Sequence, residues 1–295
     1  MIFSYFCRME TLSNSVKELR HRYIEMLCEI YDKEEANALL MILLEHHFGI
    51  SRVALALNPD MLLSDTECLT LQSSIRQLTA SRPIQYVIGK TEFCGLEFEV
   101  DENVLIPRPE TEELVTIVSS QAKTLAGAVD VLDIGTGSGC IAVSLARLIE
   151  GCRVTAIDIS GNALDVARRN AARNGASVNF INADILSDPA LPRRFDIIVS
   201  NPPYVCESER RDMRANVLDF EPPTALFVSD DDPLVFYRHI IDFARTHLKP
   251  HGTVWFEVNE HLGAETAELC RRHGFGDSAV MKDLFGKDRY VKAAR

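Results

Sequence analysis

Residues 129–140 read VDVLDIGTGSGC, and this stretch decides the fold class. Its first part, Val129–Asp133, is mostly apolar and rich in β-branched residues, which predicts a buried strand. Residues 134–139 follow with glycine at every second position, which permits a tight turn and close approach of a ligand to the backbone. A helix is predicted over Cys140–Ile149, so the stretch forms a strand, a tight turn and a helix.

The alternation of strand and helix continues outward to the C-terminus. Strands are predicted at Arg153–Asp158, Val178–Asn182, Asp196–Ser200 and Thr253–Val258, and helices at Asn162–Asn174, Pro233–His247 and Glu260–Arg272. This alternation is typical of a doubly wound α/β sheet with helices on both faces. Ligands of such sheets bind beyond the carboxyl ends of the strands, which is where the polar and glycine-rich residues of this sequence fall.

The N-terminal part of the chain has a different pattern. Residues from about 11 to 81 are predicted to be helical, with the spacing of a capping box at Asp32–Glu35 and at Ser64–Glu67. The first helix should end near Gly49 and the second before Pro83. Short helices joined by tight turns indicate a small bundle.

A β-hairpin is predicted between the bundle and the α/β region, with strands at Tyr86–Ile88 and Leu96–Val100. The sequence therefore predicts three parts. They are a helical domain over residues 1–82, a hairpin linker over residues 83–109, and an α/β domain over residues 110–295.

The composition indicates a folded globular protein, with 46% hydrophobic and 25% charged residues. The net charge is −12, whereas proteins that hold duplex DNA by its phosphates usually present a basic face. We therefore expect no stable nucleic-acid partner. The acidic balance fits a small-molecule cofactor and a protein partner better.

Cysteine spacing and the N-terminus bear on the cellular compartment. The eight cysteines are scattered without a C-x-x-C pair, which excludes a zinc pattern and a dense disulfide framework, so no metal site is predicted. Residues 1–9 lack the basic region and the cleavage site of a signal peptide. No apolar run approaches the roughly 20 residues of a membrane span. We expect a cytoplasmic protein without a membrane partner, and translation can start at Met1 or at Met9.

The glycine-rich turn is the first candidate for a cofactor site. It consists of Gly135, Thr136, Gly137, Ser138 and Gly139. A nicotinamide fingerprint requires a glycine where Cys140 stands, so that pattern fails. Asp133 suits a cofactor that carries an amino acid, because its carboxylate can bond to an ammonium group directly or through water. The alternative is a tight strand-to-helix turn that binds nothing.

Acidic residues also follow the next two strands. Asp158 ends the second strand, where a carboxylate can accept two hydrogen bonds from a ribose diol. Its alternative role is to cap a helix before Ser160. Asp184 follows the third strand and is placed to meet an adenine amino group, with a turn aspartate as the alternative.

The fourth strand runs into Asn201, Pro202, Pro203 and Tyr204. A pair of prolines cannot continue a central strand, because neither residue has an N–H to donate. The chain must therefore leave the sheet here, at its ligand-binding edge. The alternative is a turn that contains an asparagine by chance.

These residues suit chemistry on a planar amide or amine nitrogen, which is a poor nucleophile because its lone pair is delocalised. The side-chain carbonyl of Asn201 and the backbone carbonyl of Pro202 can each accept a hydrogen bond from one N–H of a substrate NH2 group. Those bonds favour loss of planarity, and the ring of Tyr204 can pack on the flat substrate group. No strong base is required, because the two acceptors stabilise the positive charge that develops on nitrogen.

The glycine-rich turn and the motif at 201–204 together resemble the amino-methyltransferases that modify adenine, cytosine or glutamine nitrogens. Three further stretches narrow the resemblance: LIPRPETE at 105–112, FEPPTAL at 220–226 and PIQYVIG at 83–89. With them, the sequence from about residue 82 to the C-terminus is similar to the bacterial peptide chain release factor glutamine methyltransferases.

The resemblance implies a Rossmann-like domain that uses S-adenosylmethionine to methylate the side-chain nitrogen (N5) of a glutamine. The expected target is the Gly-Gly-Gln motif of class 1 peptide chain release factors. The resemblance also implies that residues 135–139, Asp158, Asp184 and Asn201 contact the cofactor or the target amide. The chain departs from the family at Asn259, where a glycine is frequent, and at Ile185, a cofactor-pocket position where some members carry an aromatic residue.

Other functions stay open from the sequence. The substrate can be a glutamine of a ribosomal protein or an adenine (N6) of a nucleic acid, although the acidic charge and the absence of an added target-recognition domain disfavour DNA. A non-catalytic cofactor-binding or interaction protein is a further alternative, which the intact motif at 201–204 disfavours. Because a glutamine side chain is the same in every protein, specificity must come from a remote surface. We expect residues 1–82 to supply that surface; the alternative is a purely stabilising role.

Overall fold

The computed structural model describes residues 13–125, 127–191 and 193–294. The chain forms two compact units, Met1–Ile88 and Gly89–Arg295, and each is described by itself. The predictions that concern residues 1–9 and the two possible start methionines fall outside the described residues. No helix in the described part of the chain is both long enough and apolar enough to cross a membrane.

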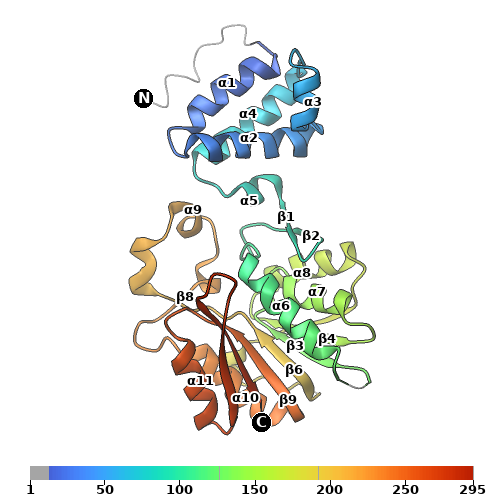
Figure 1. Cartoon of the computed structure of the whole chain (residues 1–295), viewed down its shortest axis with the longest axis vertical. Coiled ribbons are helices and arrows are strands. Elements are labelled where there is room, and N and C mark those ends of the chain that lie inside the picture. Colours follow the sequence, from blue (N-terminus) through green and yellow to red (C-terminus); the bar gives the residue numbers. More distant parts are fainter. Residues whose placement is uncertain (1–12, 126, 192, 295) are drawn as a thin grey trace. The chain divides into compact units, whose positions relative to one another are not determined.

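The first unit consists of helices. They are α1 (Val16–Leu27), α2 (Lys33–Phe48), α3 (Arg52–Leu57), α4 (Asp65–Thr79) and α5 (Ile84–Ile88) (Figure 1). The Asp32 side chain accepts a hydrogen bond from the backbone N–H of Glu35, and Ser64 and Glu67 form a complete capping box. Helix α2 ends at Gly49, whose φ of +66° is the left-handed conformation that glycine adopts without strain. The predicted starts and ends of these two helices are confirmed.

The predicted strand at Tyr86–Ile88 is wrong, because these residues form the short helix α5. The backbone N–H groups of Tyr86 and Val87 both bond to the carbonyl of Pro83, and Gly89 ends the turn with a φ of +73°. Ile84, Val87 and Ile88 pack against the apolar core of the helical unit. Burial of this apolar face, rather than the strand preference of the residues, decides the local structure.

In the described part of the second unit, seven strands form one sheet in the order β10-β11-β9-β6-β3-β4-β5. The strands are β3 (Asp130–Ile134), β4 (Arg153–Asp158), β5 (Val178–Asn182), β6 (Phe195–Ser200), β9 (Leu248–Glu257), β10 (Asp277–Lys282) and β11 (Asp288–Ala294). The five strands that the sequence predicts, β3, β4, β5, β6 and β9, pair in parallel, whereas β11 is antiparallel to both of its neighbours. The hairpin of β10 and β11 was not predicted.

Helices cover both faces of this sheet, as the alternating pattern predicts. Figure 1 shows α6 (Pro109–Ala122), α7 (Cys140–Leu148) and α8 (Gly161–Arg173) on one side, and α10 (Val235–His247) and α11 (Gly263–Arg272) on the other. Successive side chains of β6 alternate between the two apolar cores: Ile197 and Val199 face the first, and Ile198 faces the second. Burial on both faces explains the nearly continuous apolar sequence of the central strands.

Shorter elements follow the third and fourth of these parallel strands along the chain and lie near the ligand-binding edge. They are η2 (Ile185–Ser187), β7 (Val205–Cys206), η3 (Glu207–Asp212), α9 (Ala215–Leu218), η4 (Pro223–Ala225) and β8 (Phe227–Val228). Strands β7 and β8 pair in parallel as a separate two-stranded sheet after the proline-containing turn.

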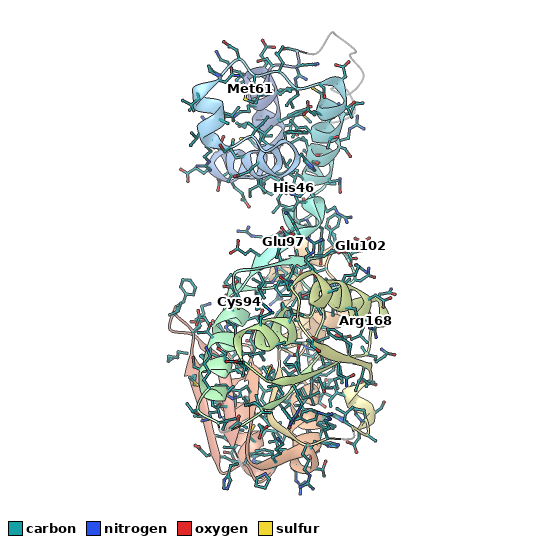
Figure 2. The ribbon with its side chains drawn as sticks, turned by 90° about the vertical axis from the view of Figure 1, so that its right-hand side faces the viewer. His46, Met61, Cys94, Glu97, Glu102 and Arg168 are labelled. Carbon is teal, nitrogen blue, oxygen red and sulfur yellow. The ribbon has the colours of Figure 1, made fainter. Side chains whose placement is uncertain are left out.

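Within the second unit, the hairpin of β1 (Lys90–Phe93) and β2 (Leu96–Glu99) packs against α8 (Figure 2, where Cys94 and Glu97 mark the hairpin and Arg168 marks α8). Asn170 on α8 joins the hairpin to the glycine-rich turn. Its Oδ1 accepts a hydrogen bond from the N–H of Glu99 at 2.6 Å, and its Nδ2 donates to the carbonyls of Glu99 and Ser138, each at 2.9 Å. Asn170 is fully buried, so all of these bonds are shielded from water.

We expect Asn170→Ala to lower the free energy of unfolding of the second unit by about 2–4 kcal/mol, because it leaves one N–H and two carbonyls without partners. Asn162→Ala, at an exposed position of the same helix, is the control and should cost roughly 1 kcal/mol or less. Urea denaturation followed by the fluorescence of Trp255 measures this unit alone, since the chain has one tryptophan. Equal midpoints for the two variants would contradict the bridging role of Asn170.

Candidate active site

A cavity of about 480 Å³ lies at the carboxyl ends of the parallel strands. The loop after each of four neighbouring strands contributes one of the predicted residues to its lining: Gly135 after β3, Asp158 at the end of β4, Asp184 after β5 and Asn201 after β6. The predicted residues Gly137, Ile185, Pro202 and Pro203 line it as well. Asp133, Thr136, Ser138, Gly139 and Tyr204 are not part of the lining.

The glycine-rich turn contributes backbone to the cavity. Gly135 and Gly137 have φ angles of +74° and +54°, which place them in the left-handed region. Gly139 serves packing instead: a Cβ atom at that position would lie 3.0 Å from the Cβ of Ala167, so α8 can approach the turn only because Gly139 has no side chain. The side chains of Thr136 and Ser138 are buried.

Asp133 lies fully buried beside the turn. Its Oδ2 accepts a hydrogen bond of 2.6 Å from the Thr136 hydroxyl, and its Oδ1 has no hydrogen-bond partner among the described side chains and backbone groups. Burial raises the pKa of Asp133 to about 7, and the nearby Asp158 carboxylate adds to the shift. The structure therefore places this carboxyl behind the cavity wall, close to a second acid that faces the cavity.

Asp158 lines the cavity and also stabilises the glycine-rich turn. Its Oδ2 accepts from the N–H of Gly137 at 2.9 Å, and its Oδ1 accepts from the N–H of Ser160 at 2.8 Å. Burial raises the pKa of Asp158, while these backbone N–H groups oppose the shift. Each carboxylate oxygen can accept a second hydrogen bond, so a ligand diol can still be bound. The cap of α8 is Ser160 and not Asp158, because the Ser160 hydroxyl accepts from the N–H of Ala163.

Asp184 both lines the cavity and stabilises a turn. Its two carboxylate oxygens accept from the N–H of Leu186 at 2.9 Å and from the hydroxyl of Ser187 at 3.1 Å, which fixes η2. The neighbouring Ile185 is buried and supplies apolar lining next to Ile157. The turn interpretation of Asp184 therefore holds, and it is compatible with contact to a ligand.

The Asn201 carboxamide is held by a chain of hydrogen bonds. Its Nδ2 lies 3.1 Å from the Oγ1 of Thr111, and that hydroxyl lies 2.7 Å from the Oε2 of Glu257. A hydroxyl has one proton to donate, and the carboxylate of Glu257 can only accept once it is ionised, above its raised pKa of about 7. With Glu257 ionised, Thr111 donates to Glu257 and accepts from the NH2 group of Asn201. This assignment leaves the Oδ1 of Asn201 as an acceptor and the second N–H of its Nδ2 as a donor.

Glu257 ends β9 and is almost completely buried. Its Oε1 accepts a hydrogen bond of 3.1 Å from the hydroxyl of Tyr204. Burial raises the pKa of Glu257 to about 7, and the hydrogen bonds from Thr111 and Tyr204 and the charge of Arg289 oppose that shift. Burial also raises the pKa of Tyr204, so its hydroxyl keeps the proton that it donates. The Tyr204 hydroxyl thus supports Glu257, whereas the sequence predicted that its ring packs on a substrate.

Thr111 and Glu257 were not predicted as site residues. Thr111 lies in the stretch at 105–112, and Glu257 lies two residues before Asn259, where the chain differs from the family. From the sequence, neither residue was assigned a function. Asn259 itself bonds to Glu209 through its Nδ2 and accepts from the N–H of His261. Its side chain thus fixes the loop after β9.

The stretches at 105–112 and 220–226 meet at one buried carboxylate. Glu221 accepts from the N–H of Ile106 at 3.2 Å and from the guanidinium of Arg108 at 2.6 Å. Leu105 and Pro222, on either side of this contact, line the cavity. The ion pair of Arg108 and Glu221 therefore joins two loops that are distant in sequence into one wall.

Comparisons with known proteins show which families the chain resembles. The Methyltransferase small domain family matches residues 114–220, and the PrmC N-terminal domain family matches residues 18–89. The release factor glutamine methyltransferase of Flavobacterium psychrophilum is 43% identical over 94% of this chain and 98% of its own length. That of Bacteroides thetaiotaomicron is 44% identical over 92% of this chain and 97% of its own length. A solved 16S rRNA methyltransferase of T. thermophilus covers 70% of this chain and 49% of its own with a TM-score of 0.51, and at 18% identity it shows the fold alone.

We expect wild type to lose stability relative to Glu257→Gln as the pH rises from about 4.5 to about 7. The folded-state pKa of Glu257, about 7, exceeds its ordinary value of 4.5. Between these values the folded chain binds a proton that the unfolded chain has released, so the stabilising contribution is complete below the lower pKa and is lost through the upper one. The change should reach about 3 kcal/mol at most. Urea denaturation at several pH values, followed by Trp255 fluorescence, measures it, and parallel pH profiles would refute the shifted pKa.

Proposed function

This chain belongs to the release factor glutamine methyltransferase family, and from that premise we propose that it methylates the side-chain nitrogen (N5) of the glutamine in the Gly-Gly-Gln motif of class 1 peptide chain release factors. The observation that carries the proposal is the orientation of Asn201. Its carboxamide presents an acceptor at a cavity wall, and Thr111 together with the ionised carboxylate of Glu257 favours this orientation over the opposite one.

The cavity residues fit S-adenosylmethionine. Gly135 and Gly137 provide bare backbone, Asp158 keeps acceptor capacity for a ribose diol, and Ile157 and Ile185 provide apolar contact for an adenine ring. The nearby carboxyl groups of Asp133 and Asp158 favour a cofactor with positive charge, and the unpartnered Oδ1 of Asp133 can accept from an ammonium group through an intervening water. When bound, this cofactor supplies an activated methyl group.

The residues of this chain prepare the substrate nitrogen for methylation. The Oδ1 of Asn201 and the carbonyl of Pro202 each accept a hydrogen bond from one N–H of the glutamine amide. These bonds hold the nitrogen in place and compete with its amide resonance, so that its lone pair becomes available. Transfer of the methyl group, which breaks its bond to the cofactor's sulfur, would build positive charge on the glutamine nitrogen, and the two fixed acceptors would stabilise that charge. One N–H proton then leaves to water, which makes a strong base at the site unnecessary.

Family membership favours a release factor over a ribosomal protein or an adenine as the substrate. The two relatives named above span nearly the whole chain and are both named for release factors. A protein that acts on release factors works where translation takes place, so we also propose a cytoplasmic location. We propose the helical unit, residues 1–88, as the surface that recognises the substrate, and Gly89–Arg295 as the methyltransferase domain.

We expect Asn201→Ala to lower kcat for release factor by roughly 100-fold or more, because it removes an acceptor aimed at charge that develops during the reaction. Its affinity for S-adenosylmethionine should stay within about threefold of wild type. Transfer of labelled methyl groups and calorimetry measure the two quantities. Near-normal turnover would reject the assigned role, and a complete loss of cofactor binding would assign Asn201 to the cofactor pocket.

Asp158→Ala is the matched contrast, since it removes a cavity-lining acceptor on the cofactor side. We expect it to weaken cofactor binding by about 1.5–3 kcal/mol, which corresponds to a Kd that is roughly ten- to a hundredfold higher. An unchanged Kd in this variant would remove Asp158 from the proposed cofactor site.

A further inference from the structure

The turn between β10 and β11 presents two apolar side chains to solvent. Leu284 and Phe285 are 85% and 81% exposed, and Leu284 is the most exposed large apolar side chain among the described residues. A single exposed leucine is ordinary on a protein surface, but two adjacent large residues at a hairpin tip form a protruding apolar contact. The hairpin is the dark red pair of strands beside β9 in Figure 1.

The turn is held rigidly although its side chains are exposed. The buried Oδ1 of Asp283 accepts from the N–H groups of Phe285 and Lys287, each at 2.9 Å. Two further backbone bonds of 2.9 Å close the turn, from Asp283 to the carbonyl of Lys287 and from Gly286 to the carbonyl of Asp283. A rigid display of apolar side chains lowers the entropy lost when a partner binds them.

The same framework holds this turn and the Asn201 site. The N–H of Leu284 bonds to the Oε2 of Glu113 on α6, the helix that also carries Thr111. The hydroxyl of Tyr290 on β11 bonds to the same Oε2 and to the carbonyl of Glu110. Tyr290 lies opposite Glu257 in the sheet register, so the turn projects beyond the edge at which Glu257 supports Asn201.

We propose that the 283–287 turn docks the protein substrate, with Leu284 and Phe285 entering an apolar recess on the surface beside the target glutamine. This inference rests on the proposed function. When a substrate glutamine reaches Asn201, the surrounding surface of the substrate protein lies at this edge of the sheet. That surface is the partner that contacts the turn. The neighbouring charges favour an apolar partner surface, because Lys282 and Lys287 are paired with Asp288 and Glu260.

Leu284 and Phe285 form only part of an interface, because a protein–protein interface typically buries on the order of 1,000 Å² or more. Aromatic and leucine anchors fixed on a rigid support are suited to contribute a disproportionate share of the binding energy. The anchor should therefore act on the affinity for the protein substrate. The chemical step should be unaffected, because neither side chain lines the cavity.

The test compares the double variant Leu284→Ser/Phe285→Ser with wild type and with the control Leu148→Ser. Leu148 is 39% exposed and ends α7, at the opposite edge of the sheet. With intact release factor as substrate, we expect the double variant to raise KM roughly tenfold or more, with kcat and the Kd for S-adenosylmethionine unchanged. Leu148→Ser should leave all of these constants within about twofold of wild type.

An unchanged KM in the double variant, with an active wild type, would overturn the docking role and leave the proposed function intact. A tenfold fall in kcat or in the affinity for S-adenosylmethionine would also overturn the docking role, because the turn would then affect the catalytic site itself. Wild type that fails to methylate release factor would refute the proposed function and this inference with it. If the double variant does not fold, Phe285→Ala alone should raise KM about threefold or more, and no rise would contradict the proposal.

Discussion

The hydroxyl of Thr111 occupies the position on which the candidate site depends. It donates its one proton in a hydrogen bond of 2.7 Å to the buried carboxylate of Glu257 when that group is ionised, so the oxygen accepts from the NH2 group of Asn201. A carboxamide free to rotate would present NH2 and carbonyl alternately to a substrate. With Thr111 and Glu257 in place, the acceptor is already oriented before a substrate arrives, which is what electrostatic stabilisation of developing charge requires.

Several tertiary contacts serve the same edge of the sheet. Asn170 ties the hairpin of β1 and β2 to the glycine-rich turn, and Glu221 ties the loop at Arg108 to the loop that follows the proline motif. Each is a buried polar side chain that satisfies backbone or charged groups from distant parts of the sequence. Such contacts add little net stability but are costly to break, so they fix the cavity walls in one arrangement.

The sequence predicted what depends on local pattern. Strands β4 and β5 have the predicted bounds, β6 ends at Ser200 just before Asn201 and the two prolines, and α2 ends at Gly49. Tyr86–Ile88 was assigned wrongly, because a short apolar run takes the structure that its packing partners impose. The strand ends predicted that Gly135, Asp158, Asp184 and Asn201 would share one edge, and their roles toward a cofactor stay predictions. The bond between Thr111 and Glu257 could not be predicted, since it joins residues 146 positions apart through tertiary packing.

A comparison of Thr111→Val with Thr111→Ser tests the orientation of Asn201 most directly. Serine keeps the hydroxyl, whereas valine keeps the shape and removes the group that Asn201 and Glu257 share. The measurement is kcat for methylation of release factor, with the Kd for S-adenosylmethionine determined in parallel. The account predicts that Thr111→Ser retains kcat within about threefold of wild type, while Thr111→Val loses roughly tenfold or more at unchanged cofactor affinity. Equal kcat values for two folded variants would contradict it.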